Sequence, residues 1–258
     1  MIKKHSRNSA FTKDGDLLPI EQRTFITSEN LGSHECTIID GGSRAGYVTI
    51  QIEGWISEVR AAQVKAGQVK YPYNSAVYGK GFIGVGKYLS REDKKKTKAY
   101  KSWSELLKRS YSEKYHTIQP TYKDVTVCDE WLNFQTFAKW FEENYVEGWH
   151  LDKDLLSDES KIYSPDTCIF VPRALNNFMS NKYSTNTSGY TGVSWDKSIS
   201  KWRSEINSAK TNKSIYLGGF TDILDAAKAY TESRKEQAEV LKEQMKDLLP
   251  SKVIDRII

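Results

Sequence analysis

The stretch after residue 186 constrains the fold most. Short β-type runs alternate there with polar turns, and the spacing of apolar residues then becomes helical. Three strand candidates, SGYTGVSWD, KWRSEIN and SIYLGGF, lie within residues 187–220. From Asp222 onward apolar residues follow a helical spacing that begins with Ala226, Ala227 and Tyr230. A sheet of three such strands is too small to stand alone, so we expect the helix to cover one of its faces.

The second half of this helix has a different composition. It is dense in Glu, Lys and Gln, and its apolar residues are Val240, Leu241, Met245, Leu248 and Leu249. We interpret this half as an extended or partner-seeking tail, whereas the first half is expected to cover the strands.

The first part of the chain, residues 1–92, is expected to form a β-rich domain. Cys36–Asp40 and Gly46–Ile56 are runs of Ile, Val, Thr and Tyr bounded by glycines. The following VYGKGFIGVGKY contains a G-x-G-x-x-G string that begins at Gly79, but no strong helix follows to direct its dipole at a phosphate. We therefore expect turns and bulges at these glycines, and no nucleotide site.

In the middle region, residues 99–182, the sequence pattern predicts helices followed by two strands and a helix in a ββα-like order. Apolar residues in YKSWSELLKRSYS recur every three or four positions, and Ser102 and Glu105 resemble a capping box. A second helix is expected over DEWLNFQTFAKWFEENY, and its aromatic stripe is interpreted as core because it occupies a single face.

The ββα-like order begins with GWHLDKDLL, residues 148–156. A turn at Ser164-Pro165-Asp166, a strand from Cys168 to Val171 and a helix from Pro172 follow it. The fold class expected for the whole chain is α+β. Its expected domains are residues 1–92, 99–182 and 186–258.

Charge and composition restrict the functions only mildly. The formal net charge is +5 and the isoelectric point about 8.8, which suits a nucleic-acid binder without establishing one. SREDKKKTKAY concentrates Lys94, Lys95 and Lys96, and both a solvated linker and a phosphate-contacting arm are compatible with it. No run reaches the ~20 apolar residues of a membrane span, and the start of the chain lacks the apolar stretch of a secretory signal, so we expect a cytoplasmic protein.

The three cysteines predict no disulfide framework. Cys36, Cys128 and Cys168 are an odd number, and none of them lies in a C-x-x-C pair. Buried free thiols are the favoured interpretation. Shared metal ligation by Cys128 and Cys168 is the alternative.

The stretch SGYTGVSWDKSISKWRSEINSAKTNKSIYLGGFTDILDAAKAY resembles the DNA-binding domain of plant ethylene-response factors, the AP-two domain, which phage endonucleases also carry. Five features match in order: Gly189-Tyr190-x-Gly192-Val193, Lys201-Trp202, Glu205-Ile206, Leu217-Gly218-x-Phe220 and Ala226-Ala227-x-Ala229-Tyr230. The resemblance implies a three-stranded antiparallel sheet on a helix, with the sheet lying in the major groove of double-stranded DNA.

The resemblance also implies which residues contact DNA. By motif position they are Trp195, Lys197, Lys201, Trp202, Arg203 and Tyr216. The plant members carry arginines near Thr191 and Ser194, and the uncharged residues here imply less readout of guanine and a mostly phosphate-driven affinity. Packing at the sheet edge is the alternative role for the tryptophans, and solvation for the lysines.

The middle region resembles phage proteins of the HNH homing endonuclease type. The resemblance rests on Y-x-x-W-x-x-L-L-x-R-x-Y, P-T-Y-x-D-x-x-V-C-x-E-W and L-D-K-D-x-L. An HNH site needs a histidine as general base and a divalent metal held by His, Asn or Asp. Alignment of YSPDTCIFVPRALNN with the second element of the family places Asp152 on the aspartate of the family and Lys153 on its histidine.

Lys153 makes ordinary HNH catalysis unexpected, because a protonated lysine is a poor base at neutral pH. The sequence therefore favours a phage-type DNA-binding protein with a degenerate nuclease site. An active metal-dependent DNA endonuclease is the first alternative, with a catalytic set of His150, Asp152, Lys153, Asp154 and Asn177 and Mg²⁺ held by Asp152, Asp154 and Asn177. An interaction or inhibitor protein built on a DNA-binding fold is the second.

Overall fold

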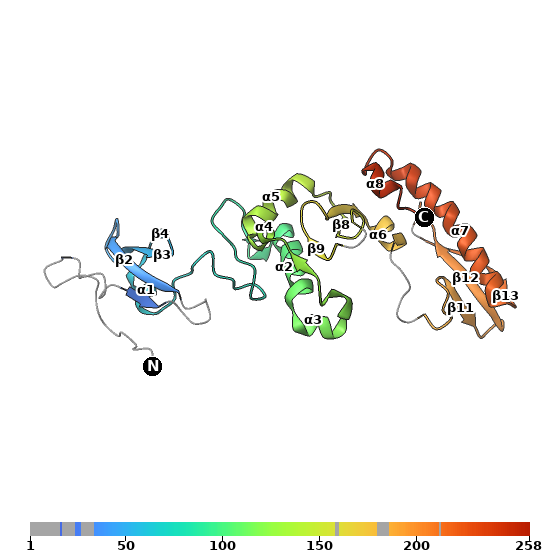
Figure 1. The fold of residues 1–258 in the computed structure, drawn as a ribbon, viewed down its shortest axis with the longest axis horizontal. Coiled ribbons are helices and arrows are strands. Elements are labelled where there is room, and N and C mark those ends of the chain that lie inside the picture. The colour runs from blue at the N-terminus through green and yellow to red at the C-terminus, as the bar shows by residue number, and fades with distance from the viewer. Residues whose placement is uncertain (1–15, 17–23, 27–33, 158–159, 180–185, 212) are drawn as a thin grey trace. The chain divides into compact units, whose positions relative to one another are not determined.

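A computed structural model describes residues 16, 24–26, 34–157, 160–179, 186–211 and 213–258 of the chain. Helices occur together with several small antiparallel sheets, so the α+β class is confirmed (Figure 1). The chain divides into two compact units, of which one ends at Phe141 and the other begins at Glu142. This division groups the residues differently from the three expected domains, which stay a prediction.

An antiparallel meander forms the start of the first unit. In the order β1-β2-β3-β4 it contains β1 (Thr24–Ile26), β2 (Glu35–Gly41), β3 (Tyr47–Ile52) and β4 (Trp55–Arg60), and α1 (Ala61–Lys65) follows. The β-type run Gly46–Ile56 contains β3 and the start of β4. Glu53 and Gly54 take left-handed φ angles of 47° and 86° and make a two-residue turn between β3 and β4.

The rest of this unit contains short strands and helices. They are β5 (Arg91–Glu92), β6 (Lys95–Lys96), α2 (Lys98–Tyr111), α3 (Glu113–Ile118), the 3-10 helix η3 (Pro120–Tyr122), β7 (Thr126–Val127), α4 (Asp129–Leu132) and most of α5 (Phe134–Asn144), whose last turn belongs to the second unit. The aromatic stripe expected to be core is buried, since the side chains of Trp131, Phe134 and Phe137 are fully inaccessible. The interpretation of this stripe as core is confirmed.

The start of α2 differs from the expected start. Thr97 is the N-cap, because its side chain accepts a hydrogen bond from the backbone N–H of Tyr100 at 3.3 Å. The capping box of Ser102 and Glu105 is therefore wrong, since Ser102 lies inside the helix. Glu105 forms ion pairs one turn further on, with Lys108 and Arg109.

The helix expected over DEWLNFQTFAKWFEENY is broken at Asn133 into α4 and α5. Phe82 from the glycine-rich stretch causes the break, because its backbone inserts between the two helices. Its N–H donates to the carbonyl of Leu132, and its carbonyl accepts from the N–H of Phe134, both at 2.9 Å. A long-range backbone pairing of this kind leaves no local signal in the sequence.

The glycine-rich stretch packs against the helices. A side chain at Gly81 would collide with Trp103 and Leu107, and one at Gly84 would collide with Asn133. Gly79 and Gly84 both have a φ of +71°, as expected for turns. The expectation of turns at these glycines is confirmed, and close packing on the helices explains why the stretch needs glycine.

The second unit begins with a strand pair and a short helix. β8 (Trp149–Asp152) and β10 (Ile169–Pro172) pair antiparallel, β9 (Ile162–Tyr163) lies in the connection between them, and α6 (Arg173–Met179) follows β10 directly. Strand, connection, strand and helix therefore occur in the order that the sequence predicts.

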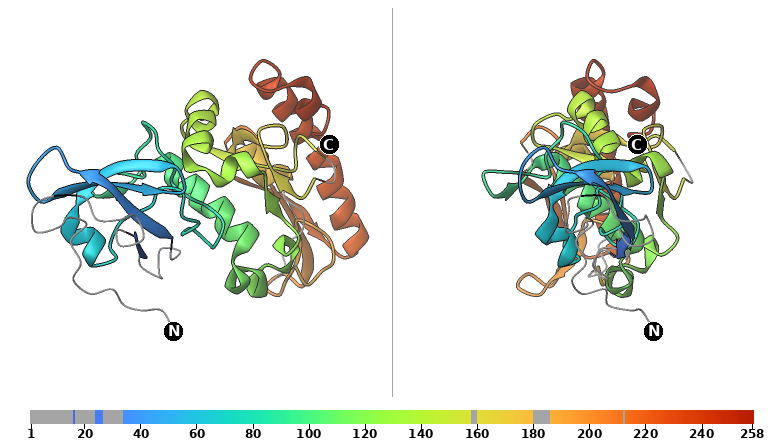
Figure 2. Two further views of the ribbon diagram at one scale, coloured as in Figure 1. Left: turned by 60° about the vertical axis from the view of Figure 1, so that its left-hand side comes forward. Right: turned by 90° about the vertical axis from the view of Figure 1, so that its left-hand side faces the viewer.

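A three-stranded antiparallel sheet and a long helix follow. They are β11 (Val193–Asp196), β12 (Lys201–Asn207), β13 (Ser214–Phe220) and α7 (Ile223–Met245), and α8 (Ser251–Ile254) ends the chain. The strand order is β11-β12-β13, and α7 lies across one face of the sheet (Figures 1 and 2). The sheet and its covering helix agree with the pattern of the sequence.

The second half of α7 belongs to a core and is not a free tail. Leu155, Val171 and Leu175 from the ββα-like part pack with residues from α7 and the segment after it: Ala238, Leu241, Met245, Leu249, Val253 and Ile257. The expectation of an extended tail is therefore wrong, because these apolar residues are buried within their own unit. A protein partner for this helix stays a prediction.

Within the described residues no helix is both long and apolar enough to cross a membrane. Residues 1–15, on which the expected lack of a secretory signal depends, lie outside the described part of the chain. The cytoplasmic location stays a prediction.

Candidate nucleic-acid interface

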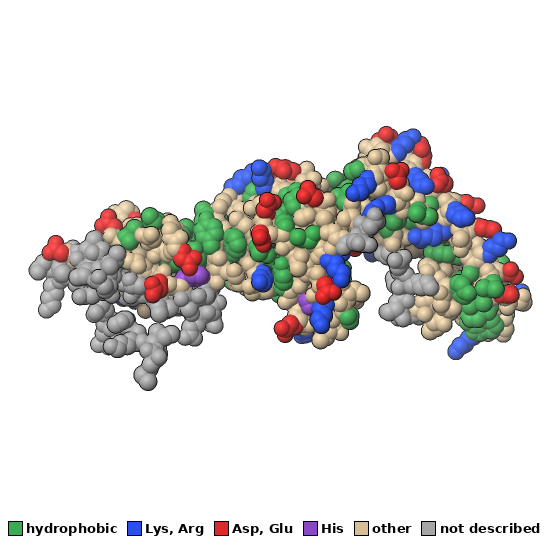
Figure 3. All heavy atoms as spheres, in the orientation of Figure 1, with side chains coloured by type: hydrophobic (Ala, Val, Ile, Leu, Met, Phe, Trp, Pro, Cys, Tyr) green, Lys and Arg blue, Asp and Glu red, His purple; other side chains and the backbone are tan. Residues whose placement is uncertain are grey.

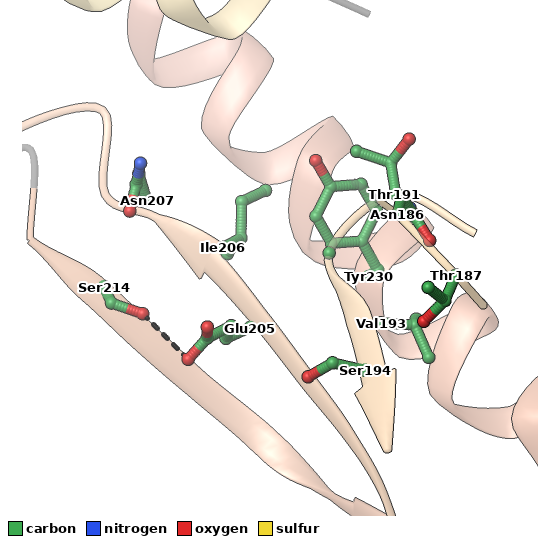
Figure 4. A pocket seen from close by; sticks show the side chains of 11 residues that line it. Asn186, Thr187, Thr191, Val193, Ser194, Glu205, Ile206, Asn207, Ser214 and Tyr230 are labelled. Carbon is green, nitrogen blue, oxygen red and sulfur yellow. Dashed lines mark hydrogen bonds between the residues drawn. The ribbon is translucent and has the colours of Figure 1, made fainter. Parts of the chain in front are cut away.

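The sheet of the second unit has a covered face and a free face. Side chains alternate between the two faces along a strand. In β12, Ser204 and Ile206 are buried and face α7. Tyr230 of α7 packs on Gly192, where a φ of +71° and the lack of a side chain let the ring approach. Figure 4 shows Ile206 and Tyr230 on this helix side of the strands.

The free face brings together three of the residues expected to contact DNA. Lys201 and Arg203 alternate with the buried positions of β12, and Tyr216 of β13 lies opposite Glu205. The guanidinium carbon of Arg203 lies 5.4 Å from the centre of the Tyr216 ring. A side chain at Gly219 would lie 3.0 Å from the Tyr216 hydroxyl and 3.5 Å from Cδ of Lys201.

A β-bulge sets this arrangement. The register shifts between Ser204, which pairs with Gly218, and Glu205, which pairs with Tyr216. The extra residue in β13 is Leu217, and it places both Tyr216 and Gly219 on the free face. Because Gly219 has no side chain, Tyr216, Ile199 and Lys201 can approach the strand closely at this position. The free face therefore combines Tyr216 with the basic Lys201 and Arg203, and Glu205 adds an acidic group to it.

Trp195 and Trp202 do not belong to this group. They lie directly opposite each other on β11 and β12, and their rings meet edge to face with centroids 5.1 Å apart. Alternation from Val193 and Ser204 places both on the α7 side of the sheet. Trp195 is still 47% exposed, so it lies at the sheet edge. Lys197 is exposed in the turn after β11.

Glu205 belongs to the matched Glu205-Ile206 feature but is not among the residues expected to contact DNA. Its carboxylate accepts two hydrogen bonds from Arg203, from Nε at 3.1 Å and from Nη2 at 2.8 Å. The Ser214 hydroxyl donates to the same oxygen at 3.3 Å, as Figure 4 shows. The pair partly neutralises Arg203. Strand alternation could have revealed it, because residues two apart in a strand share a face.

The turn between β11 and β12 is held by Asp196. Its carboxylate accepts hydrogen bonds from the backbone N–H of Ser198 at 2.9 Å and from the Ser198 hydroxyl at 2.6 Å. These hydrogen bonds to Ser198 lower the pKa of Asp196, with the nearby Arg203 as a smaller contribution. The turn that presents Lys197 is therefore locally ordered.

The residues expected in the nuclease site have structural roles at the end of β8. One oxygen of the Asp152 carboxylate accepts the backbone N–H groups of Asp154 at 2.8 Å and Leu155 at 2.9 Å. Lys153 forms an ion pair with Asp154, and only 12% of the Lys153 side chain is exposed. Arg256 donates to the carbonyls of Asp154 and Leu155, which ties this turn to the C-terminal segment.

His150 and Asn177 are both exposed. His150 lies opposite Val171 in the strand pair and shares a strand face with Asp152, and Asn177 lies on α6. Among the described residues, no group of three or more His, Cys, Asp and Glu side chains lies close enough together to hold a metal ion. Magnesium binding that involves Asn177 stays a prediction.

The three cysteines are free thiols, as the favoured interpretation expects. Cys36 and Cys168 are buried and Cys128 is partly buried. Burial raises the pKa of the Cys36 thiol from 9.0 to about 11, and burial is also the main cause of the raised pKa of Cys128. Metal sharing by Cys128 and Cys168 stays a prediction.

Comparison with known proteins adds no relative. No protein-family model, no curated protein and no solved structure matches the chain. The class that fold and surface define is therefore a coarse one, an α+β protein with a helix-backed sheet and a partly basic free face. The resemblances to AP-two domains and HNH endonucleases rest on the quoted motifs alone.

Proposed function

We propose that this chain binds double-stranded DNA through the free face of β11, β12 and β13. The observation that carries the proposal is the grouping of Lys201, Arg203 and Tyr216 on that face. α7 occupies the opposite face, so the free face is the one that a DNA duplex could approach. The motif resemblance to AP-two domains supports the same face, because that family lays its sheet in the major groove.

Binding through this face is expected to depend mainly on phosphates. The uncharged Thr191 and Ser194 stand near positions where the plant family has arginines, so bidentate contacts with guanine are fewer. Arg203 shares its guanidinium with Glu205, which reduces its availability for a base. Lys197 and Lys201 are point charges suited to the phosphate backbone. Weak sequence preference and strong salt dependence follow.

We propose also that the ββα-like part of the second unit is a scaffold without a working HNH base. Lys153 stands at the position of the family's histidine, and its ammonium is paired with Asp154. Asp152 uses its carboxylate to hold the turn that follows β8. This part also shares its core with α7, so it supports the helix behind the DNA-binding sheet.

Fluorescence anisotropy of a labelled duplex at low and moderate salt tests DNA binding. The Lys201→Ala/Arg203→Ala variant of the full chain should bind roughly tenfold more weakly and lose about two units of the slope of log affinity against log salt. Lys228→Ala/Lys235→Ala is the matched control, because it removes two exposed charges from α7. Equal binding by both variants would refute the proposed face. Absence of any low-salt affinity would favour the interaction-protein alternative.

A supercoiled-plasmid assay with Mg²⁺ or Mn²⁺ tests the scaffold proposal. The wild-type chain should leave the plasmid intact, and Asp152→Ala should behave in the same way. Metal-dependent nicking by the wild type that disappears in Asp152→Ala would instead establish an active endonuclease.

A further inference from the structure

The lysine-rich segment of the first unit forms a small β-hairpin. β5 and β6 pair through Arg91 with Lys96 and Glu92 with Lys95. The two residues between the strands, Asp93 and Lys94, have φ angles of 45° and 65°, which is the left-handed geometry of a two-residue hairpin turn. Glycine or asparagine usually occupies such positions, so a lysine there costs backbone strain.

The tip of this hairpin has a fixed shape. The Arg91 guanidinium donates to the carbonyl of Lys94 at 3.1 Å and so closes the turn. Lys94, Lys95 and Lys96 are all exposed, and the Lys96 ammonium lies 5.4 Å from the centre of the Tyr100 ring. The segment is therefore a hairpin with exposed lysines, which agrees with the solvation that the linker interpretation expects. Phosphate contact by these lysines stays a prediction.

The base of the hairpin is fastened on both sides. Before β5, the Gln135 side chain donates to the carbonyl of Tyr88 and accepts from its N–H, both at 3.0 Å. After β6, the Thr97 hydroxyl donates to the carbonyl of Leu89 at 3.0 Å, and its backbone N–H donates to Ser90 at 3.1 Å. Because Thr97 also caps α2, the hairpin is built onto the start of that helix.

Positive charge is concentrated in and around this hairpin. Residues 87–101 contain seven Lys and Arg and two Asp and Glu, so their net charge of +5 equals the formal charge of the whole chain. In the part of the chain that the structure describes, no carboxylate pairs with Lys94, Lys95 or Lys96. By contrast, α7 carries i,i+3 pairs such as Lys242 with Glu239, and Figure 3 shows mixed charge along it.

We propose that the β5–β6 hairpin is a second, sequence-independent DNA contact that binds the phosphate backbone of a duplex. A two-stranded ribbon is narrow enough for the major groove, and lysines at its tip and on β6 reach phosphates as point charges. The inference builds on the proposed function, since hairpin and sheet would then be two DNA-binding modules on one chain. Two linked modules bind one duplex more tightly than either alone.

The test compares three variants of the full chain by anisotropy with a labelled duplex over a range of salt. The hairpin variant is Lys94→Gln/Lys95→Gln/Lys96→Gln. Its matched control is Lys65→Gln/Lys70→Gln/Lys114→Gln, which removes the same charge from exposed lysines of the same unit. The sheet variant Lys201→Ala/Arg203→Ala is measured beside them. Thermal unfolding by circular dichroism verifies that each variant remains folded.

We expect the hairpin variant to lose about three units of the salt slope and at least tenfold in low-salt affinity, with the control close to wild type. Equal affinities of hairpin variant and control would overturn the hairpin contact while leaving the sheet untouched. If the hairpin variant lost DNA affinity and the sheet variant did not, the hairpin contact would be supported and DNA binding by the free face of the sheet would be refuted. A folded wild type with no low-salt affinity would overturn both.

Discussion

At the scale of single residues, Glu205 is expected to weaken the proposed DNA binding. It holds Arg203 in place by two hydrogen bonds, and it also adds a negative charge to the surface that is proposed to meet phosphates. The orientation of Arg203 by Glu205 should strengthen DNA binding, whereas repulsion between Glu205 and phosphates should weaken it. For a mainly phosphate-driven interaction the repulsion should dominate, because the exposed ion pair itself is worth little.

Replacing Glu205 by Gln should therefore tighten DNA binding. We expect an increase of about two- to fivefold at low salt, because the substitution removes a carboxylate that repels nearby phosphates, and salt screens this repulsion least under these conditions. Glu239→Gln is the matched control, because Glu239 is equally charged and pairs with Lys242 on α7. Fluorescence anisotropy measures the affinity of both variants. A lower affinity of Glu205→Gln would contradict the prediction and would mean that Arg203 needs Glu205 for its orientation.

Asp152 is expected to matter for stability. Its carboxylate satisfies the N–H groups of Asp154 and Leu155, so Asp152→Ala should lower the free energy of unfolding by about 1–2 kcal/mol. Asp152→Asn keeps an acceptor oxygen and should lower the free energy of unfolding by less than Asp152→Ala does. Urea unfolding followed by circular dichroism measures both, and an unchanged midpoint in Asp152→Ala would contradict the structural role.

Cys36 predicts a pH dependence at the alkaline end. Its folded pKa of about 11 lies above the ordinary thiol value of 9.0, so the folded state keeps the proton that the unfolded state releases. The stabilisation is complete below pH 9 and is lost as the pH rises toward 11. The unfolding free energy of wild type should fall over this window relative to Cys36→Ala, and a constant difference would contradict the prediction.

At the scale of elements, sequence periodicity predicts those helices and strands that bury one face. The three strands, α7 and the buried stripe of α5 all follow from local alternation or helical spacing. The hairpin turn at Glu53 and Gly54, the break at Asn133 and the N-cap at Thr97 do not. The break depends on Phe82, a partner distant in sequence, and the turn depends on two left-handed backbone angles. The Thr97 cap is a local contact with Tyr100, but the pattern of Ser102 and Glu105 competed with it in the sequence.

The candidate site was predictable to a similar extent. Motif position identifies Lys201, Arg203 and Tyr216, which the structure gathers on one face. It does not separate them from Trp195 and Trp202, although strand alternation does so for Trp202, which lies between Lys201 and Arg203 in β12. A bulge in β13 also determines the outcome, and bulges have no reliable sequence pattern.

The packing of α7 gives a prediction at the scale of elements. Leu241 is fully buried in the shared core, whereas Leu248 is 58% exposed. Leu241→Ala should lower the free energy of unfolding by about 2–5 kcal/mol because it leaves a cavity, and Leu248→Ala should have little effect. Chemical unfolding of both variants measures this difference. Similar small losses in both would restore the interpretation of this half as a tail.

At the scale of the whole molecule, the chain consists of two units with different proposed contributions to one DNA duplex. The second unit offers the free face of β11–β13, supported from behind by α7 and the ββα-like part. The first unit offers the β5–β6 hairpin built onto α2. Steep salt dependence is expected from the sum of both contacts, because each phosphate contact releases counterions.

The most direct test of the central claim is photo-crosslinking of the full chain to a labelled duplex. A benzophenone amino acid is placed at position 216 on the free face or at position 235 on the exposed side of α7. Crosslinked DNA should form from position 216 and decrease with added salt, whereas position 235 should give none above background. Crosslinking from position 235 without crosslinking from position 216 would contradict the claim that DNA lies on the free face of the sheet.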